Sequence, residues 1–227
     1  DDGQNEYDLR GVHGENVRRE AEEGYTGRAG RSGASDGRNS PENEGERRTA
    51  PASWARGRVT DRPSPAAGIA AENAGRYGTD AFVVEDAAIK ERNPNAWALT
   101  SGGNIYISDS IPAELADVVG YHEAVHAARQ RGQEQYSDFL DKTGDYIDLQ
   151  SGRAKQVLNV ILESRFTGRS LASLNSAERE RAYDELNAVV WGFHKADPEN
   201  ARAQFADMFQ DYDAYIADLD AAMESGA

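Results

Sequence analysis

Two histidines and a glutamate, His122, Glu123 and His126, have residue types and a spacing that could do chemistry. On an α-helix, residues four apart lie one above the other on the same face, so both imidazoles could bind one metal ion. Glu123 directly follows the first histidine, and its carboxylate would then point toward a water on that metal rather than toward the metal itself. The pattern therefore predicts a metal centre with two histidine ligands, a general base and an open ligand position.

A zinc centre of this kind needs a third protein ligand. The chain contains no cysteine, so this ligand must be a histidine or a carboxylate. No histidine lies between His126 and His194, and we therefore prefer Glu163 as the third ligand. Glu163 lies in the apolar segment 157–166, where a buried carboxylate would be costly unless it paired with a cation such as the metal. The alternatives are a salt bridge to Arg165 or another basic residue, and an exposed position on the edge of the helix.

Other side chains compete for the remaining roles at the centre. In addition to Glu123, we regard His194 as a second catalytic candidate. It could donate a hydrogen bond to the oxyanion that forms when water attacks a carbonyl, or it could be the third ligand in place of Glu163. The ordinary interpretation of His194 is a histidine that ends a helix. Three aspartates in a polar, turn-like stretch are weaker ligand candidates, and two tyrosines are weaker oxyanion donors. These five residues are Asp141, Asp145, Asp148, Tyr121 and Tyr146.

The helix that carries the motif is expected to begin near Ser110 and to end near Arg131. Asp109 and Ser110 offer N-cap oxygens, and Gly132 suits the end of a helix. Apolar side chains from Leu115 onward share a stripe with both histidines. The metal would therefore lie on a helix face that otherwise packs into the core.

Short β-favouring segments precede the motif helix. Residues 81–85 predict one strand, and residues 96–100 and 104–108 predict a hairpin around Ser101-Gly102-Gly103. From Ser110 to the end of the chain the pattern is helical. We therefore predict an α+β fold that is mostly helical, with a small N-terminal sheet or hairpin, the motif helix and a C-terminal helical part.

Residues 1–65 differ in composition from the rest of the chain. They are rich in Gly, Arg, Glu, Asn and Ser, and they contain no Ile or Phe. Such a segment buries too little apolar surface to offset the entropy of ordering it. We interpret residues 1–65 as a low-complexity, disordered tail or linker, with a pro-segment or a partner-binding strip as alternatives, and residues 66–227 as one folded domain.

The whole chain sets further limits on function. Its net charge is −15, from 25 basic and 40 acidic residues, and such a surface disfavours nucleic-acid binding. No stretch approaches the roughly 18 apolar residues of a membrane span, and no early run resembles a signal peptide. These features favour a cytoplasmic location over secretion. Because the chain begins with Asp1 rather than methionine, we expect it to be a fragment of a longer polypeptide.

The motif helix, the strand before it and the later helix with Glu163 resemble the zincin metallopeptidases, and within them the gluzincins, which use a glutamate as the third ligand. In that superfamily an edge strand pairs with extended substrate, and residues 103–107 occupy the corresponding place. Leu162 stands where thermolysin-type enzymes have an asparagine. The resemblance to those enzymes therefore does not extend to the residue that precedes the expected third ligand, Glu163. A narrower likeness, over roughly residues 80–195, is to zincin-like domains embedded in large multi-domain proteins of phages and conjugative elements.

The resemblance implies a zinc-dependent peptidase, an endopeptidase rather than an exopeptidase, that acts on a peptide or protein. One Zn²⁺ would be held by His122, His126 and Glu163, with Glu123 as the general base. One alternative is a zincin-like interaction module that binds metal but cleaves nothing. Another is an auto-processing protease whose substrate is its own tail, around residues 56–58.

Overall fold

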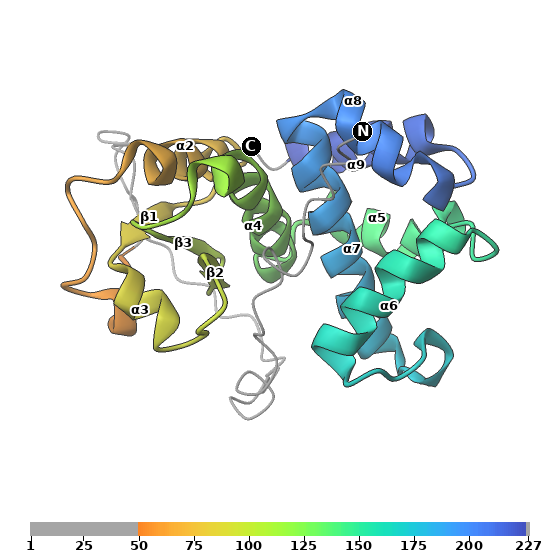
Figure 1. The fold of residues 1–227 in the computed structure, drawn as a ribbon, viewed down its shortest axis with the longest axis horizontal. Helices are drawn as coiled ribbons and strands as arrows, with labels where there is room; N and C mark the ends of the chain where they lie inside the picture. Colours follow the sequence, from red (N-terminus) through yellow and green to blue (C-terminus); the bar gives the residue numbers. More distant parts are fainter. Residues whose placement is uncertain (1–49, 226–227) are drawn as a thin grey trace, which may run out of the picture.

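The computed structural model of the chain describes residues 50–225, and residues 1–49 of the predicted tail lie outside this range. The described part is α+β and mostly helical, as the sequence predicts (Figure 1). Its strands are β1 (Ala81–Val84), β2 (Ala98–Ser101) and β3 (Asn104–Ser108), and its α-helices are α2 (Pro65–Gly75), α3 (Asp86–Lys90), α4 (Ala116–Gln130), α5 (Glu134–Tyr146), α6 (Gly152–Phe166), α7 (Ser176–Ala196), α8 (Pro198–Phe205) and α9 (Tyr212–Glu224). Among residues 50–225, no helix has the length and apolar character needed to cross a membrane.

The three strands form one sheet in the order β1-β3-β2. β3 runs parallel to β1 and antiparallel to β2, and β2 and β3 form the predicted hairpin. Gly102 and Gly103 connect these two strands with φ values of 61° and 78°, the left-handed conformations that a tight two-residue hairpin turn requires. Because β3 is the middle strand, the prediction that residues 103–107 form an edge strand is wrong. β2, on the side of β3 opposite β1, is an edge strand of this sheet.

Side chains alternate between the two faces of the sheet, as the pleat of a strand requires. Ile105 and Ile107 belong to the main core together with side chains of α2 and α4, whereas Tyr106 belongs to a smaller cluster on the other face. In this cluster the rings of Trp54 and Tyr106 lie 4.6 Å apart, and Tyr106 Oη accepts a hydrogen bond from the Ala52 N–H at 2.7 Å.

These contacts extend the folded part of the chain beyond the predicted boundary. Ala55 is completely buried in the smaller cluster, so the folded domain includes residues that we predicted to belong to the tail. The composition of residues 1–65 as a whole conceals these few apolar contacts, because Trp54 and Ala55 hardly change the average hydropathy of a polar segment.

Helix α4 ends as predicted but begins later than predicted. It starts at Ala116, after a 3₁₀ turn, η2 (Ala113–Leu115). Asp109 does not cap it, because its Oδ1 accepts a hydrogen bond from the Asp86 N–H at the start of α3, at 3.1 Å. At the other end Gly132 has a φ of 66°, which ends the helix after Gln130 as expected.

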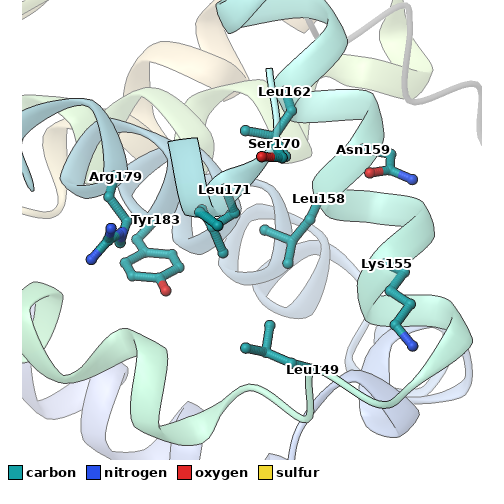
Figure 2. A pocket seen from close by; sticks show the side chains of 10 residues that line it. Leu149, Lys155, Leu158, Asn159, Leu162, Ser170, Leu171, Arg179 and Tyr183 are labelled. Carbon is teal, nitrogen blue, oxygen red and sulfur yellow. The ribbon is translucent and has the colours of Figure 1, made fainter. Parts of the chain in front are cut away.

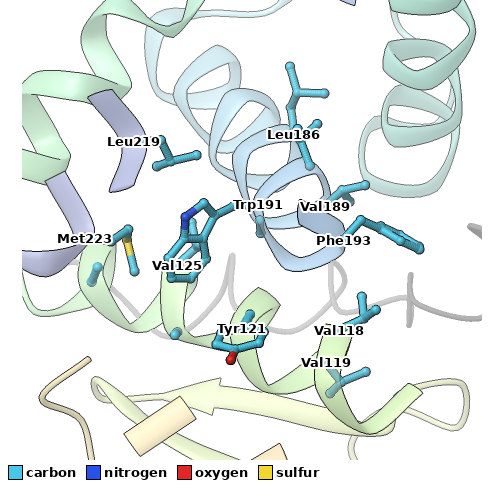
Figure 3. Packing of buried hydrophobic residues seen from close by; sticks show 14 of the residues in the cluster. Val118, Val119, Tyr121, Val125, Leu186, Val189, Trp191, Phe193, Leu219 and Met223 are labelled. Carbon is cyan, nitrogen blue, oxygen red and sulfur yellow. The ribbon is translucent and has the colours of Figure 1, made fainter. Parts of the chain in front are cut away.

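The helical part of the core is built around α7, which packs along α4 (Figures 1 and 3). Figure 3 shows Trp191 of α7 beside Val125 and Tyr121 of α4, with Leu219 and Met223 of α9 on the far side of the tryptophan. Burial of large apolar side chains along this contact supplies most of the free energy that holds the two helices together. The relative placement of α4 and α7 is therefore fixed by core packing.

Candidate metal centre

His122, His126 and Glu185 each offer one ligand atom, and these three atoms lie within 4.8 Å of one another. The two Nε2 atoms are 3.1 Å apart; Glu185 Oε1 lies 3.5 Å from Nε2 of His122, and Glu185 Oε2 lies 3.6 Å from Nε2 of His126. Glu185 and both histidines have side chains that are largely removed from solvent. Two imidazoles and a carboxylate held on helices at this spacing fit the donor set of a single divalent metal such as zinc.

Glu185 reaches the histidines because α7 is fixed at its start and lies close to α4. Asn175 and Glu178 form a reciprocal capping box at the N-terminus of α7. Near its other end, Gly192 permits a close approach, since a Cβ there would lie 3.0 Å from the Val118 carbonyl oxygen of α4. Both features position Glu185 from a distance, through the placement of the whole helix.

Asp184, next to Glu185, orients the second histidine. Its Oδ2 lies 2.7 Å from Nδ1 of His126 and accepts a hydrogen bond from Nε of Arg129 at 2.9 Å, and its Oδ1 accepts one from the Tyr136 hydroxyl at 2.9 Å. A carboxylate on Nδ1 holds the proton of the imidazole on that nitrogen, so Nε2 is available as a ligand. Asp184 therefore holds the His126 ring in the orientation in which Nε2 lies close to His122 and Glu185.

The pKa of His126 reflects these neighbours. Burial by itself lowers the pKa of this imidazole, but the charge of Asp184 and the hydrogen bond to it outweigh burial, with smaller effects from Glu185 and Glu123. Together they raise the pKa of His126 from 6.5 to about 9. In the metal-free chain at neutral pH, His126 is consequently a doubly protonated imidazolium. A metal that binds Nε2 would have to displace the proton on that nitrogen.

Arg165 of α6 contacts Glu185, the third candidate ligand. Its Nη2 lies 2.6 Å from Oε2 of Glu185, and its side chain is 18% exposed. A carboxylate as buried as Glu185 is costly without a cationic partner, and Arg165 supplies one. The charged residues at the centre thus include an arginine from a third helix, α6, in addition to the residues of α4 and α7.

Glu123 lies beside the two histidines and is held by the edge strand. Thr100 of β2 donates a hydrogen bond from Oγ1 to Oε2 of Glu123 at 2.6 Å, and both side chains are buried. Burial raises the pKa of Glu123, while the charge of His126 and the hydrogen bond from Thr100 lower it; the net shift is upward. A raised pKa is the property expected of a carboxylate that first accepts and then returns a proton near neutral pH.

Glu163 does not take part in this centre. The prediction that its side chain is buried is wrong, because Glu163 is exposed on the outer face of α6, and the structure brings Glu185 to the histidines instead. α6 buries only one stripe, which consists of Ala154, Val157, Leu158, Ile161 and Leu162. A signal for Glu185 was present in the sequence: two adjacent acidic residues, Asp184 and Glu185, directly precede the uncharged segment 186–193 within one helical pattern.

His194 is also placed away from the centre. It lies nine residues beyond Glu185 on α7, which corresponds to about 13 Å along the helix and half a turn around it. Its Nδ1 lies 3.2 Å from the Tyr212 hydroxyl, and burial lowers the pKa of His194. The structure therefore does not support His194 as a ligand or as an oxyanion donor.

The five weaker candidates contact other parts of the molecule. Tyr121 packs its ring against Trp191, and Tyr146 donates a hydrogen bond to Asp218. The stretch expected to be turn-like is helical as far as Tyr146, and its aspartates do not belong to the group around the histidines. Asp141 and Asp145 are exposed on α5, and Asp148 accepts a hydrogen bond from the Gln150 N–H.

Comparisons of this chain with protein-family models, with curated proteins and with solved structures found no match. The function of the centre is therefore inferred from its own geometry and chemistry.

Proposed function

We propose that the chain is a zinc-dependent peptidase whose metal ligands are His122, His126 and Glu185 and whose general base is Glu123. The observation that carries this proposal is the convergence of the three ligand atoms within 4.8 Å, beside a buried glutamate that directly follows the first ligand. Two histidines and one glutamate are a ligand set of catalytic zinc sites that keep a fourth position open for water. In this proposal the hairpin, α4 and α7 are the parts of a zincin-like domain of the gluzincin kind.

The proposed reaction is hydrolysis of a peptide bond. When bound, zinc would lower the pKa of a water molecule toward neutrality and polarise the scissile carbonyl. Glu123 would accept the proton of this water and deliver it to the leaving amine nitrogen. Thr100 occupies one carboxylate oxygen of Glu123, so Oε1 is the atom that we assign to proton transfer.

The proposed substrate is an extended segment of a peptide or protein. An edge strand can pair with such a segment through its unpaired main-chain groups. We assign this role to β2, because β2 is an edge strand and its Thr100 touches the proposed base. The middle strand β3, with Tyr106, has partners on both sides and cannot serve in this way.

A second candidate function is a metal-binding module that cleaves nothing. The closed character of the centre favours it, because Glu123 is only 9% exposed and hydrogen-bonded to Thr100, and Arg165 is paired with Glu185. Both candidates require the metal, but only the peptidase requires a proton acceptor at residue 123.

The first experiment measures zinc in the purified, reconstituted full chain by plasma mass spectrometry. The wild type is expected to hold close to one zinc per chain, and His122→Ala and Glu185→Gln are expected to lose it. Glu163→Gln is the matched control and should bind zinc as the wild type does, because Glu163 is exposed outside the centre. A correctly folded wild type that takes up no zinc would contradict both candidate functions.

The second experiment separates the two candidates. The zinc-loaded wild type and Glu123→Gln are incubated with a peptide library, and the products are identified by mass spectrometry. The peptidase proposal expects Glu123→Gln to keep its zinc and to lose at least about 100-fold in cleavage rate. Cleavage that survives in this variant would reject Glu123 as the base. A zinc-loaded wild type that cleaves no peptide would favour the silent module.

A further inference from the structure

A cavity of about 450 Å³ lies between α6, the first turns of α7 and the two segments that flank α6 (Figure 2). It is separate from the metal centre. Tyr183 lines the cavity, whereas Glu185, two residues further along α7, faces the histidines, and residues two apart on a helix point to nearly opposite sides. The lining residues are Leu149, Lys155, Leu158, Asn159, Leu162, Ser170, Leu171, Ala172, Arg179 and Tyr183.

The cavity has an apolar interior. Leu158 and Leu162 of α6 are buried and form part of its wall, and Leu149 faces them across the opening in Figure 2. Leu149 is 49% exposed, so about half of its side chain is open to solvent at this cavity. An apolar ligand in the cavity would cover this leucine and bring the three side chains into contact with it.

The charge of the lining is opposite to that of the chain. The whole chain has a net charge of −15, but the cavity is lined by two cations, Lys155 and Arg179, and by no aspartate or glutamate. Lys155 Nζ donates to the Gln150 carbonyl at 3.2 Å, and Arg179 Nη2 donates to the Leu174 carbonyl at 3.3 Å. Within the described range, 50–225, neither cation forms an ion pair with a carboxylate. Figure 2 shows the two cations on opposite sides of the cavity, with the leucines between them.

We propose that this cavity is a binding site for a small apolar carboxylate. Its hydrocarbon part would lie against Leu149, Leu158 and Leu162, and its carboxylate would pair with Lys155 or Arg179. The cavity volume falls within the range of about 300–1,000 Å³ that is typical of small-molecule sites. The positive charges of Lys155 and Arg179 favour an anion over a neutral or cationic molecule with the same apolar body. This inference does not depend on the proposed peptidase function.

The test uses decanoate as the probe, with the full chain and concentrations below micelle formation, in isothermal titration calorimetry. We expect saturable binding at one site, with weaker binding of neutral decanol and still weaker binding of the decyltrimethylammonium cation. Binding that does not saturate, or equal affinity for decanoate and decanol, would overturn the proposal.

Variants then locate the site. Lys155→Met or Arg179→Met, or both, should weaken decanoate binding about 2- to 5-fold, as expected for an exposed ion pair. Ser170→Trp, at an exposed position of the lining, should fill the cavity and reduce affinity at least about tenfold. Arg181→Met is the matched control, because Arg181 is an exposed cation of the same helix outside the lining. Unchanged affinity in Ser170→Trp, or in the double variant of Lys155 and Arg179, would place decanoate elsewhere and refute the site.

Discussion

Two adjacent carboxylates of α7 have different tasks at the candidate centre. Asp184 holds Nδ1 of His126, and Glu185 lies near the Nε2 atoms of both histidines. Successive helix residues point about 100° apart, so one helix can present a metal ligand and the partner of another ligand at the same time. Each carboxylate also has an arginine, Arg129 for Asp184 and Arg165 for Glu185, which offsets the cost of burying its charge.

Replacement of Asp184 by asparagine should weaken zinc binding without removing a ligand. The amide carries no charge and holds the proton on Nδ1 of His126 less strongly, so we expect zinc affinity to fall about 10- to 100-fold. Affinity is measured by competition with a chromophoric chelator, with folding checked by circular dichroism. Asp141→Asn, an exposed position on α5, is the control and should bind zinc like the wild type. Equal affinity in both variants would refute the orienting role of Asp184.

The raised pKa of His126 predicts a pH dependence of zinc binding. Below its pKa of about 9, the metal-free imidazole holds a second proton, and zinc can bind Nε2 only as this second proton leaves. Apparent affinity should therefore rise by up to about tenfold per pH unit from pH 7 toward 9 and then level off. Calorimetry in two buffers with different ionisation enthalpies counts the released protons. Binding at pH 7 without proton release would contradict the assignment.

The same shift sets the sign of a stability change in the metal-free chain. The pKa of His126 in the folded chain lies above the value of 6.5 in the unfolded chain. The contribution of protonated His126 to the free energy of unfolding is therefore complete below pH 6.5 and is lost as the pH rises through 9. In urea unfolding, the metal-free wild type should thus lose more stability between pH 6.5 and 9 than His126→Gln does. Parallel pH profiles of the two proteins would contradict this sign.

At the scale of elements, local patterns predicted the hairpin and the end of α4, because turn glycines and helix ends depend on nearby residues. The carboxylate that lies beside the histidines was not predictable in the same way. Glu163 and Glu185 both lie in helices with apolar stripes, and which carboxylate reaches His122 depends on how α6 and α7 pack against α4. The contact between Thr100 and Glu123 likewise follows from the placement of β2 at the edge of the sheet, which the hairpin pattern alone does not give.

Close packing of α2 against α4 supplies an element-scale prediction. A Cβ at Gly120 of α4 would lie 2.4 Å from the Ala70 carbonyl oxygen of α2, so the helices would have to separate. We expect Gly120→Ala to lower the free energy of unfolding by about 1–3 kcal/mol, despite the higher helix propensity of alanine.

Gly68 of α2 is the matched control for Gly120, because a Cβ there meets nothing within 4 Å. Gly68→Ala should raise the free energy of unfolding by about 0.5–1 kcal/mol through helix propensity alone. Urea unfolding followed by circular dichroism measures both variants. A stabilising effect of Gly120→Ala would show that the two helices are less closely packed than the structure indicates.

At the scale of the whole molecule, the candidate centre joins two parts of the core. α4 lies against the sheet, whereas α7 is surrounded by the C-terminal helices, and the candidate ligands come from both (Figure 1). The unfolded chain does not bring Glu185 close to His122, since they are far apart in sequence. A metal that binds the folded chain more tightly must therefore raise its stability by mass action.

Zinc is accordingly expected to raise the melting temperature of the full chain. Free zinc at 100 times its Kd adds about 2.7 kcal/mol to the free energy of unfolding. For a folded domain of this size, this corresponds to a rise in melting temperature of roughly 5–10 °C. Differential scanning calorimetry of zinc-loaded and chelator-treated protein measures the difference. Glu185→Gln should abolish most of this zinc-dependent increase, while the exposed Glu163→Gln should retain it. Retention of the full increase in Glu185→Gln would mean that the stabilising metal binds outside the contact between α4 and α7.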